Sequence, residues 1–290
     1  MHCVYRLLRL KDIKSGTERR KIVFYELDNN MWLLVLVSLI VVSLIAALVF
    51  LRTIWFHRDP EHIIHSHPNE EILSPVYGIV AYIKKIENGR IVAEKKEETM
   101  EINEITKDDW PNEFPDGNGW LVGIAMTALD VHFQYAPLSG EIVSINHKTT
   151  GRNLPMFDLW EYIRITWFRK WVQLIGKKYL LENERQTMWM KTKHAKIALV
   201  LIADKFVDKI TTFVKVNEQV KQAQKLSFIG RGSQVDVVIC GHHDLEFKVK
   251  PGDAVKGPYT TLARLNPAQN LGTHSPEMPH PHTFESSINT

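Results

Sequence analysis

The hydrophobic pattern divides the chain into one long apolar run and many short ones. Residues 31–51 contain two serines as their only polar side chains and carry no charge. As a helix this run would be roughly 31 Å long, which matches the hydrocarbon core of a bilayer. Trp32, Arg52 and Trp55 flank it, as is typical at a membrane interface. A signal peptide fits less well, because the run is long and no small-residue cleavage site follows. We predict a transmembrane or membrane-hairpin anchor over residues 31–55.

Beyond the anchor, short β-type runs alternate with turn residues. Residues 56–71 are polar and interrupted by prolines, so we predict a linker. The following runs predict strands at 78–86, 120–126, 140–146, 196–204, 233–239 and 244–250. The expected fold class is mainly β with some α (α+β), with one or two helices in a domain over residues 72–265. The Pro- and His-rich tail 266–290 is expected to be disordered.

Residues 157–179 differ from their surroundings in composition. They hold Trp160, Trp167 and Trp171 beside five basic residues, among them Arg169. One interpretation is a core helix or loop cover whose aromatic rings fill the interior. The other is an interfacial element that contacts membrane and substrate, with rings at the headgroup level and cations near anionic lipid. The neighbouring anchor favours the second interpretation.

The net charge and the number of cysteines indicate which partners and which kinds of site to expect. The net charge of +3 agrees with an anionic membrane surface and gives no support for nucleic-acid binding. Cys3 and Cys240 are too few for a disulfide framework, and no Cys/His spacing indicates a metal site. We therefore expect a lipid bilayer as a partner, no nucleic acid and no metal.

The basic N-terminal extension, residues 1–30, carries seven Lys and Arg residues. Under the positive-inside rule these charges would keep the N-terminus in the cytoplasm and the large domain outside. If Met31 is the true start, Arg52 and Arg58 become the inner flank and the domain faces the cytoplasm. Both alternatives stay open. We expect an anchored protein of the inner cell membrane, with the cytoplasmic face favoured.

The strongest local signal for chemistry is a Gly-Ser pair before a predicted strand, Gly232 and Ser233 within FIGRGSQVDVV. On spacing alone this pair would be a glycine bulge at the start of a strand. Five other stretches change that interpretation, because they occur in an order and spacing typical of one family. They are FHRDP (56–60), ILSPVYG (72–78), DVHFQYAPLSGEIV (130–143), ENER (182–185) and KPGDAVKG (250–257).

Together these stretches resemble the motifs of the phosphatidylserine decarboxylase family, over about residues 54–265. The resemblance implies a phosphatidylserine-decarboxylase-like β domain and a self-processing proenzyme. The Ser233 hydroxyl would attack the Gly232 carbonyl, so that the peptide bond becomes an ester. β-Elimination and loss of ammonia would then leave a covalent pyruvoyl cofactor. A β chain ending at Gly232 and an α chain beginning at residue 233 would remain partners.

The resemblance also implies the reaction. The pyruvoyl group made from Ser233 would form a Schiff base with the amine of a membrane phospholipid substrate and accept electrons as carbon dioxide leaves. Phosphatidylserine would become phosphatidylethanolamine. Two alternatives stay open: a non-processed, non-catalytic membrane-tethered relative, and a pyruvoyl decarboxylase of another amino-acid head group. A homodimer is also left open.

His132 is the candidate acid/base, because an imidazole exchanges protons near neutral pH. In isolation His132 would be interpreted as a structural histidine. Its surroundings resemble the family segment, however, and this resemblance favours the acid/base role. The family aspartate of the Ser-Pro-x-Asp-Gly motif is replaced here by Tyr77. A tyrosine can form hydrogen bonds but carries no charge at neutral pH. Processing would therefore be slow, use Asp130 instead, or be lost.

Overall fold

The structure is a computed structural model. It describes residues 16–60, 70–92, 99–108, 117–151, 153–170, 172–205, 210–230, 233–241 and 245–265. The chain forms two compact units, residues 1–59 and 60–290. The predicted tail and most of the predicted linker lie outside the described residues.

The first unit contains a long helix, α1 (Gly16–Phe50), which continues as a short π-helix, η1 (Leu51–Trp55). Its side chains are described from Met31 onward, and those of residues 31–54 are all exposed. Within the described residues, Met31–Trp55 is the one helix long and apolar enough to cross a membrane. It covers the predicted anchor without a break.

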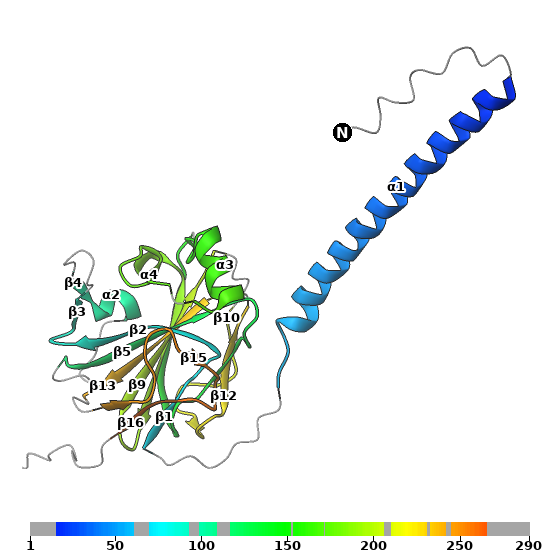
Figure 1. Ribbon diagram of the computed structural model, residues 1–290. Helices are drawn as coiled ribbons and strands as arrows, with labels where there is room; N and C mark the ends of the chain where they lie inside the picture. The colour runs from blue at the N-terminus through cyan, green and yellow to red at the C-terminus, as the bar shows by residue number, and fades with distance from the viewer. Residues whose placement is uncertain are drawn as a thin grey trace, which may run out of the picture. The chain divides into compact units, whose positions relative to one another are not determined.

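The second unit is built mainly from strands, with three helices in its described part (Figure 1). The helices are α2 (Ile102–Thr106), α3 (Leu159–Phe168) and α4 (Tyr179–Glu182). The strands are β1 (Glu71–Leu73), β2 (Gly78–Ile86), β3 (Arg90–Val92), β4 (Thr99–Glu101), β5 (Gly119–Met126), β6 (Phe133–Tyr135), β7 (Gly140–Lys148), β8 (Arg185–Thr192), β9 (Lys196–Ala203), β10 (Ile210–Thr212), β11 (Gln219–Val220), β12 (Lys225–Ile229), β13 (Ser233–Cys240), β14 (Leu245–Phe247), β15 (Ala254–Val255) and β16 (Thr261–Leu265).

The largest sheet has eight strands in the order β11-β7-β8-β9-β13-β5-β2-β15. Each pairing in it is antiparallel. Smaller sheets have the orders β1-β16-β14, β10-β12-β6 and β3-β4. Strand β13 pairs with β5 on one side and β9 on the other, and all of its residues are buried. The Val-rich sequence of β13 suits this central place, because a strand covered on both faces needs apolar side chains on both.

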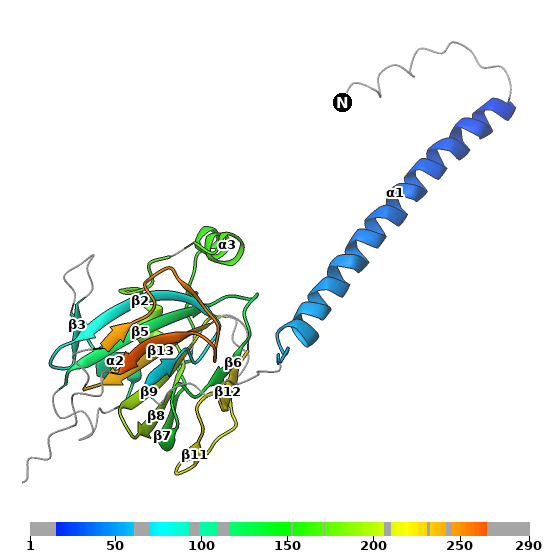
Figure 2. The same ribbon diagram turned by 60° about the horizontal axis from the view of Figure 1, so that its bottom comes forward.

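The two faces of this sheet are covered differently. One face packs against the small sheets, through residues such as Ile72, Leu226 and Ile229. The other face packs against the helices, through Ile105 of α2, Ile165 of α3 and Leu180 of α4 among others. Figure 1 shows these helices along one side of the strands, and Figure 2 shows β6 beside β12.

The predicted fold class, mostly β with some helix, agrees with the structure. The predicted strands at 78–86, 120–126, 140–146, 196–204 and 233–239 lie at β2, β5, β7, β9 and β13. Two expectations need correction. The described part of the second unit has three helices rather than one or two, because α2 and α4 are too short to leave a periodic pattern. The strand predicted at 244–250 is reduced to β14, and the chain then turns at Pro251.

Candidate active site

Ser233 is the first residue of β13 and is fully buried. It pairs with Met126, the last residue of β5, and with Ala203, the last residue of β9. Its hydroxyl oxygen lies 3.4 Å from the sulfur of Met126. The Ser233 hydroxyl is therefore held in a water-poor place where three strands end together. Gly232 lies outside the described residues.

His132 ends the loop that leads from β5 to β6, and it is fully buried. Its carbonyl oxygen accepts hydrogen bonds from the Ile229 backbone nitrogen at 3.2 Å and from the Gln134 side chain at 2.8 Å. Ile229 precedes Ser233 by four residues, a stretch of at most roughly 14 Å. The structure thus keeps His132 and Ser233 in one region, joined through Ile229 on one side and Met126 on the other.

Asp130 holds this loop to the rest of the domain. Its buried carboxylate accepts hydrogen bonds from the backbone nitrogen and the hydroxyl of Thr127, both at 2.8 Å. It also accepts two from the Arg169 guanidinium, at 3.2 and 3.3 Å. Charge-assisted bonds of this two-pronged kind fix geometry strongly. Asp130 therefore links the loop that carries His132 to the end of α3.

Tyr77 lies immediately before β2 and is partly buried. The next residue, Gly78, must be a glycine because a Cβ there would lie 2.4 Å from the Ala125 carbonyl oxygen. Ile79 pairs with Ala125, so the chain before it runs past the end of β5. Tyr77 is thus brought to the same end of the sheet as Met126.

Helix α3 begins with a capping box, in which the Asp158 carboxylate accepts a bond from the Glu161 backbone nitrogen at 2.8 Å. It ends at Arg169, whose φ of 50° is left-handed. Trp160 is 65% exposed and Trp167 is 71% exposed. These exposures argue against the interpretation in which the rings fill the interior. Contact of α3 with a membrane stays a prediction, and Trp171 lies outside the described residues.

The Asn-Glu-Arg stretch has a structural role that the sequence did not reveal. Arg185 is fully buried, and its guanidinium donates to the carbonyl oxygens of Ile105, Leu180 and Asn183 at 2.6–3.0 Å. Asn183 donates to the Ala203 carbonyl oxygen at 2.7 Å. These bonds join α2 and α4 to the end of β9. Burial lowers the pKa of Arg185 to about 10.

Two further titratable side chains lie near Ser233 and were not predicted. Asp204 follows Ala203, the partner of Ser233 in β9, and burial raises its pKa, while a bond from the Met156 backbone nitrogen at 2.8 Å opposes this. Burial also raises the pKa of Tyr162 in α3, and the backbone of Ala128 opposes this shift. Only tertiary contacts bring both groups here, so no sequence pattern identifies them.

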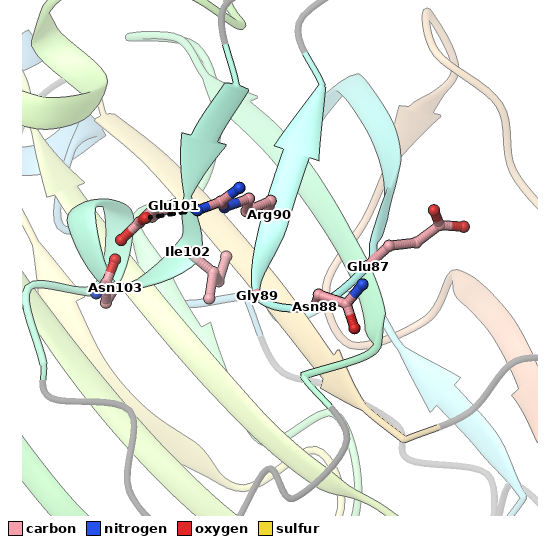
Figure 3. Close-up of a pocket in the computed structure, with 7 residues that line it drawn as sticks. All are labelled: Glu87, Asn88, Gly89, Arg90, Glu101, Ile102 and Asn103. Carbon is pink, nitrogen blue, oxygen red and sulfur yellow. Dashed lines mark ion pairs between the residues drawn. The ribbon is translucent and has the colours of Figure 1, made fainter.

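A pocket of about 590 Å³ lies elsewhere, around Gly89 and Ile102. Figure 3 shows Arg90 and Glu101 facing each other across β3 and β4, and their charged groups are 3.7 Å apart. The pocket adjoins the far end of β2, roughly 25 Å along the strand from Gly78. It therefore belongs to a different part of the domain from Ser233.

The chain is similar in sequence to known proteins of one family. Residues 49–263 match the family model described as phosphatidylserine decarboxylase. A protein of Methanocaldococcus jannaschii, provisionally named archaetidylserine decarboxylase proenzyme, is 32% identical over 74% of this chain and 90% of its own length. The phosphatidylserine decarboxylase proenzyme of Symbiobacterium thermophilum is 27% identical over 74% of this chain and 80% of its own length.

Proposed function

Because the chain belongs to the phosphatidylserine decarboxylase family, we propose that it is a membrane-anchored proenzyme that cuts itself before Ser233 and then decarboxylates the serine head group of a phospholipid. The observation that carries the proposal is the placement of Ser233. This serine is buried at the head of the central strand, beside the loop that ends at His132. An exposed serine in a mobile turn would not hold a reacting group in one orientation.

The first step of the proposal is self-cleavage. The Ser233 hydroxyl attacks the Gly232 carbonyl and an ester replaces the peptide bond. Elimination then releases the carboxylate of Gly232, and water replaces the nitrogen of residue 233, which leaves as ammonia. The product is a pyruvoyl group bonded to the nitrogen of Gln234. The surroundings of Ser233 suit this step, because few water molecules can compete with the hydroxyl in a fully buried site.

The same surroundings fit the pyruvoyl group itself. It has the three carbons of the serine from which it comes, and the sulfur of Met126 offers an apolar contact at that position. When formed, such a group supplies a ketone that withdraws electrons as carbon dioxide leaves. The chain's own residues must bind the head group, exclude water and supply a proton.

His132 is the residue that we propose to move this proton. Its backbone is fixed by the bonds from Ile229 and Gln134, and it is buried near Ser233. Asp130 and Arg169 brace the loop before it. A fixed backbone limits the reorganisation that this loop would need when the imidazole transfers a proton.

Two surfaces are proposed to contact the bilayer. The first is the helix Met31–Trp55, which would anchor the protein. The second is α3, which exposes Leu159 and Phe168 in addition to Trp160 and Trp167. A helix that exposes four large apolar side chains in ten residues is typical of one that lies in the headgroup region. The Arg169–Asp130 pair would then join the lipid surface to the His132 loop.

The names of the relatives support the proposed substrate class. One group is named for phosphatidylserine and the other for archaetidylserine, and both names denote serine lipids. We propose the serine head group as the shared substrate, with phosphatidylserine as the expected form and phosphatidylethanolamine as the product. Conversion of each lipid by the purified protein would distinguish the two forms.

One observation favours a second function. Tyr77 replaces the aspartate of the family motif, and it lies at the same end of the sheet as Ser233. Without that charge, the chain could remain uncut and act as a membrane-tethered, non-catalytic relative.

The test is incubation of purified full-length protein in detergent, followed by gel electrophoresis and an assay for carbon dioxide from carboxyl-labelled phosphatidylserine. The proposal expects a fragment spanning residues 233–290 and release of label in proportion to it. A chain that stays whole and releases no label would support the non-catalytic alternative.

A further inference from the structure

Strand β13 carries two more buried polar side chains, Gln234 and Asp236, within three residues of Ser233. Side chains alternate between the faces of a strand. Ser233 and Val235 therefore point to one face, where Met126 also lies, and Gln234 and Asp236 point to the other. Gln234 and Asp236 are fully buried. The proposed function gives this second pair no role.

The Gln234 side chain is held at both ends of its amide. The Tyr179 hydroxyl donates to its oxygen at 2.6 Å. Its nitrogen donates to the Tyr82 hydroxyl and to the Asp236 carboxylate, both at 2.5 Å. The Tyr82 hydroxyl in turn donates to the Asp236 carboxylate at 2.9 and 3.0 Å. A buried amide with each end bonded is restricted to one orientation.

The backbone around this network is shaped to admit it. A Cβ on Gly123 would lie 2.3 Å from the ring of Tyr82, so only glycine allows the ring to lie across β5. The pairing of β2 with β5 shifts register between Val80 and Tyr82, which sets Tyr82 opposite Gly123. Burial raises the pKa of Asp236 to about 7, although the hydrogen bonds from Gln234 and Tyr82 and the charge of Arg185 oppose this shift.

The network lies next to the proposed cleavage site, since Gln234 directly follows residue 233. Before cleavage, residue 233 is held by the chain on both sides. After cleavage, the new group is bonded only to the nitrogen of Gln234, and terminal residues of a strand open more easily than interior ones.

We infer that Gln234, Tyr82, Tyr179 and Asp236 are positioning residues, which keep the new end of β13 from fraying and thereby fix the orientation of the reacting group. This inference rests on the proposed function, because it concerns the chain after self-cleavage. It differs from a general contribution to stability in one respect. Loss of a network bond should loosen the start of β13 in the cut protein far more than in the uncut protein.

Tyr179→Phe tests this with little change in shape, since it removes only the hydroxyl that donates to Gln234. Hydrogen exchange at the first amides of β13 is measured by mass spectrometry on the full-length protein in detergent. In the cut protein, exchange should become about tenfold faster, as expected for loss of one buried hydrogen bond. In the uncut Ser233→Ala background, the same change should accelerate exchange by less than about twofold, because the intact chain still holds the strand.

Thr187→Val is the matched control. Thr187 is also fully buried, and its hydroxyl donates at 2.6 Å to the Thr106 carbonyl oxygen, but it lies in β8 and not beside Ser233. It should leave exchange at the start of β13 unchanged in both backgrounds. The kcat of cut Tyr179→Phe should fall about tenfold with KM unchanged, because orientation of the bound head group is lost rather than its affinity.

Equal acceleration in the cut and uncut proteins would overturn the inference, as would no acceleration in the cut protein. If Tyr179→Phe does not fold, Tyr82→Phe removes another hydroxyl of the network and replaces it in the same comparison. A wild-type chain that stays uncut would overturn the proposed function and this inference together. A wild-type chain that is cut and active, with β13 insensitive to Tyr179→Phe, would overturn the inference alone.

Discussion

Polar side chains are buried at the start of β13, whereas large apolar side chains are exposed in α3. At the start of β13, Gln234 and Asp236 are buried and bonded to other side chains. In α3, Trp160 and Trp167 are exposed. Buried polar groups with full hydrogen bonding give a fixed geometry, whereas exposed aromatic rings indicate contact with something outside the chain.

Under the proposed function, the domain would keep the reacting group apart from the surface that contacts lipid, and one connection would join the two. The connection is the ion pair between Arg169, at the end of α3, and Asp130, in the loop that leads to His132. A change at the start of β13 should therefore affect catalysis in every assay. A change in α3 should affect it only where the substrate lies in a bilayer.

Ser233→Ala should have the largest effect. It removes the hydroxyl that attacks the preceding carbonyl, so cleavage and decarboxylation should both be lost completely. Gel analysis and the labelled-lipid assay measure the two losses. Thr187→Val is a control, because Thr187 is also fully buried but its hydroxyl bonds to the Thr106 carbonyl oxygen and not near Ser233, and this variant should still be cut. Cleavage of the Ser233→Ala protein at the same site would contradict the proposed chemistry.

His132→Gln should reduce decarboxylation next most strongly. Loss of a positioned acid/base typically lowers a rate between about 10²- and 10⁴-fold. Glutamine is similar in size and polar, so the buried loop should keep its fold. The rate is measured in detergent on protein that has been cut. Activity within a few-fold of wild type, on the order of the scatter between mutants, would exclude His132 as the proton carrier.

Asp236→Asn should change how stability depends on pH. Burial raises the pKa of Asp236 to about 7, so the folded protein binds this proton more tightly than the unfolded chain does. The contribution of Asp236 to the free energy of unfolding is fully present below about pH 4. As the pH rises from about 4 to about 7, the free energy of unfolding falls by roughly 2–4 kcal/mol. The asparagine variant should lack this decline.

Urea unfolding in detergent, followed by tryptophan fluorescence between pH 4 and 7, measures the slope. Glu182→Gln, at an exposed carboxylate, should keep the slope of the wild type. An identical slope in Asp236→Asn would mean that other groups produce the pH dependence.

The double change Trp160→Ser and Trp167→Ser should separate surface contact from chemistry. On vesicles that contain phosphatidylserine, the rate should fall about tenfold, because α3 would no longer settle among the headgroups. The rate on short-chain lipid in detergent should stay unchanged. Val216→Ser, at another exposed apolar side chain, should leave both rates unchanged. An equal loss of rate in vesicles and in detergent would indicate that the tryptophans act in the reaction and not in contact with the membrane.

Tyr77→Asp should have the smallest effect, an increase of about fivefold in the rate of cleavage, because a carboxylate can stabilise a nearby imidazolium. Tyr77→Phe tests whether the hydroxyl matters by itself. Cleavage is followed by gel after synthesis. If Tyr77→Asp is cut at the same rate as wild type, another group orients the base.

The sequence predicted the central strands well because their apolar runs are local. Residues 78–86 are an example, since every residue of β2 lies in that predicted run. It did not predict β8, which begins with Arg185 and Gln186, residues that are usually exposed. Arg185 is buried because carbonyl groups from α2 and α4 surround its guanidinium, and that arrangement exists only after folding.

Some residues of the candidate site could be singled out from the sequence and others could not, because the sequence does not show which elements meet after folding. Ser233 and His132 were singled out through a resemblance of motifs, and their catalytic roles stay predictions, although the fold brings their segments together. The sequence also singled out Asp130 and Arg169, but not as a pair, because they come from elements far apart in the chain. Gln234 and Asp236 gave one local signal, two polar residues on the same face of a Val-rich strand. That signal did not indicate that Tyr82 and Tyr179 are the partners of these residues.

The central claim, that residue 233 becomes a ketone at a new chain end, is tested most directly by the mass of the fragment that begins there. This fragment should lack a free N-terminal amine and should gain one hydrazone when treated with phenylhydrazine. Full decarboxylase activity in a preparation whose chains all retain an unmodified Ser233 would contradict it.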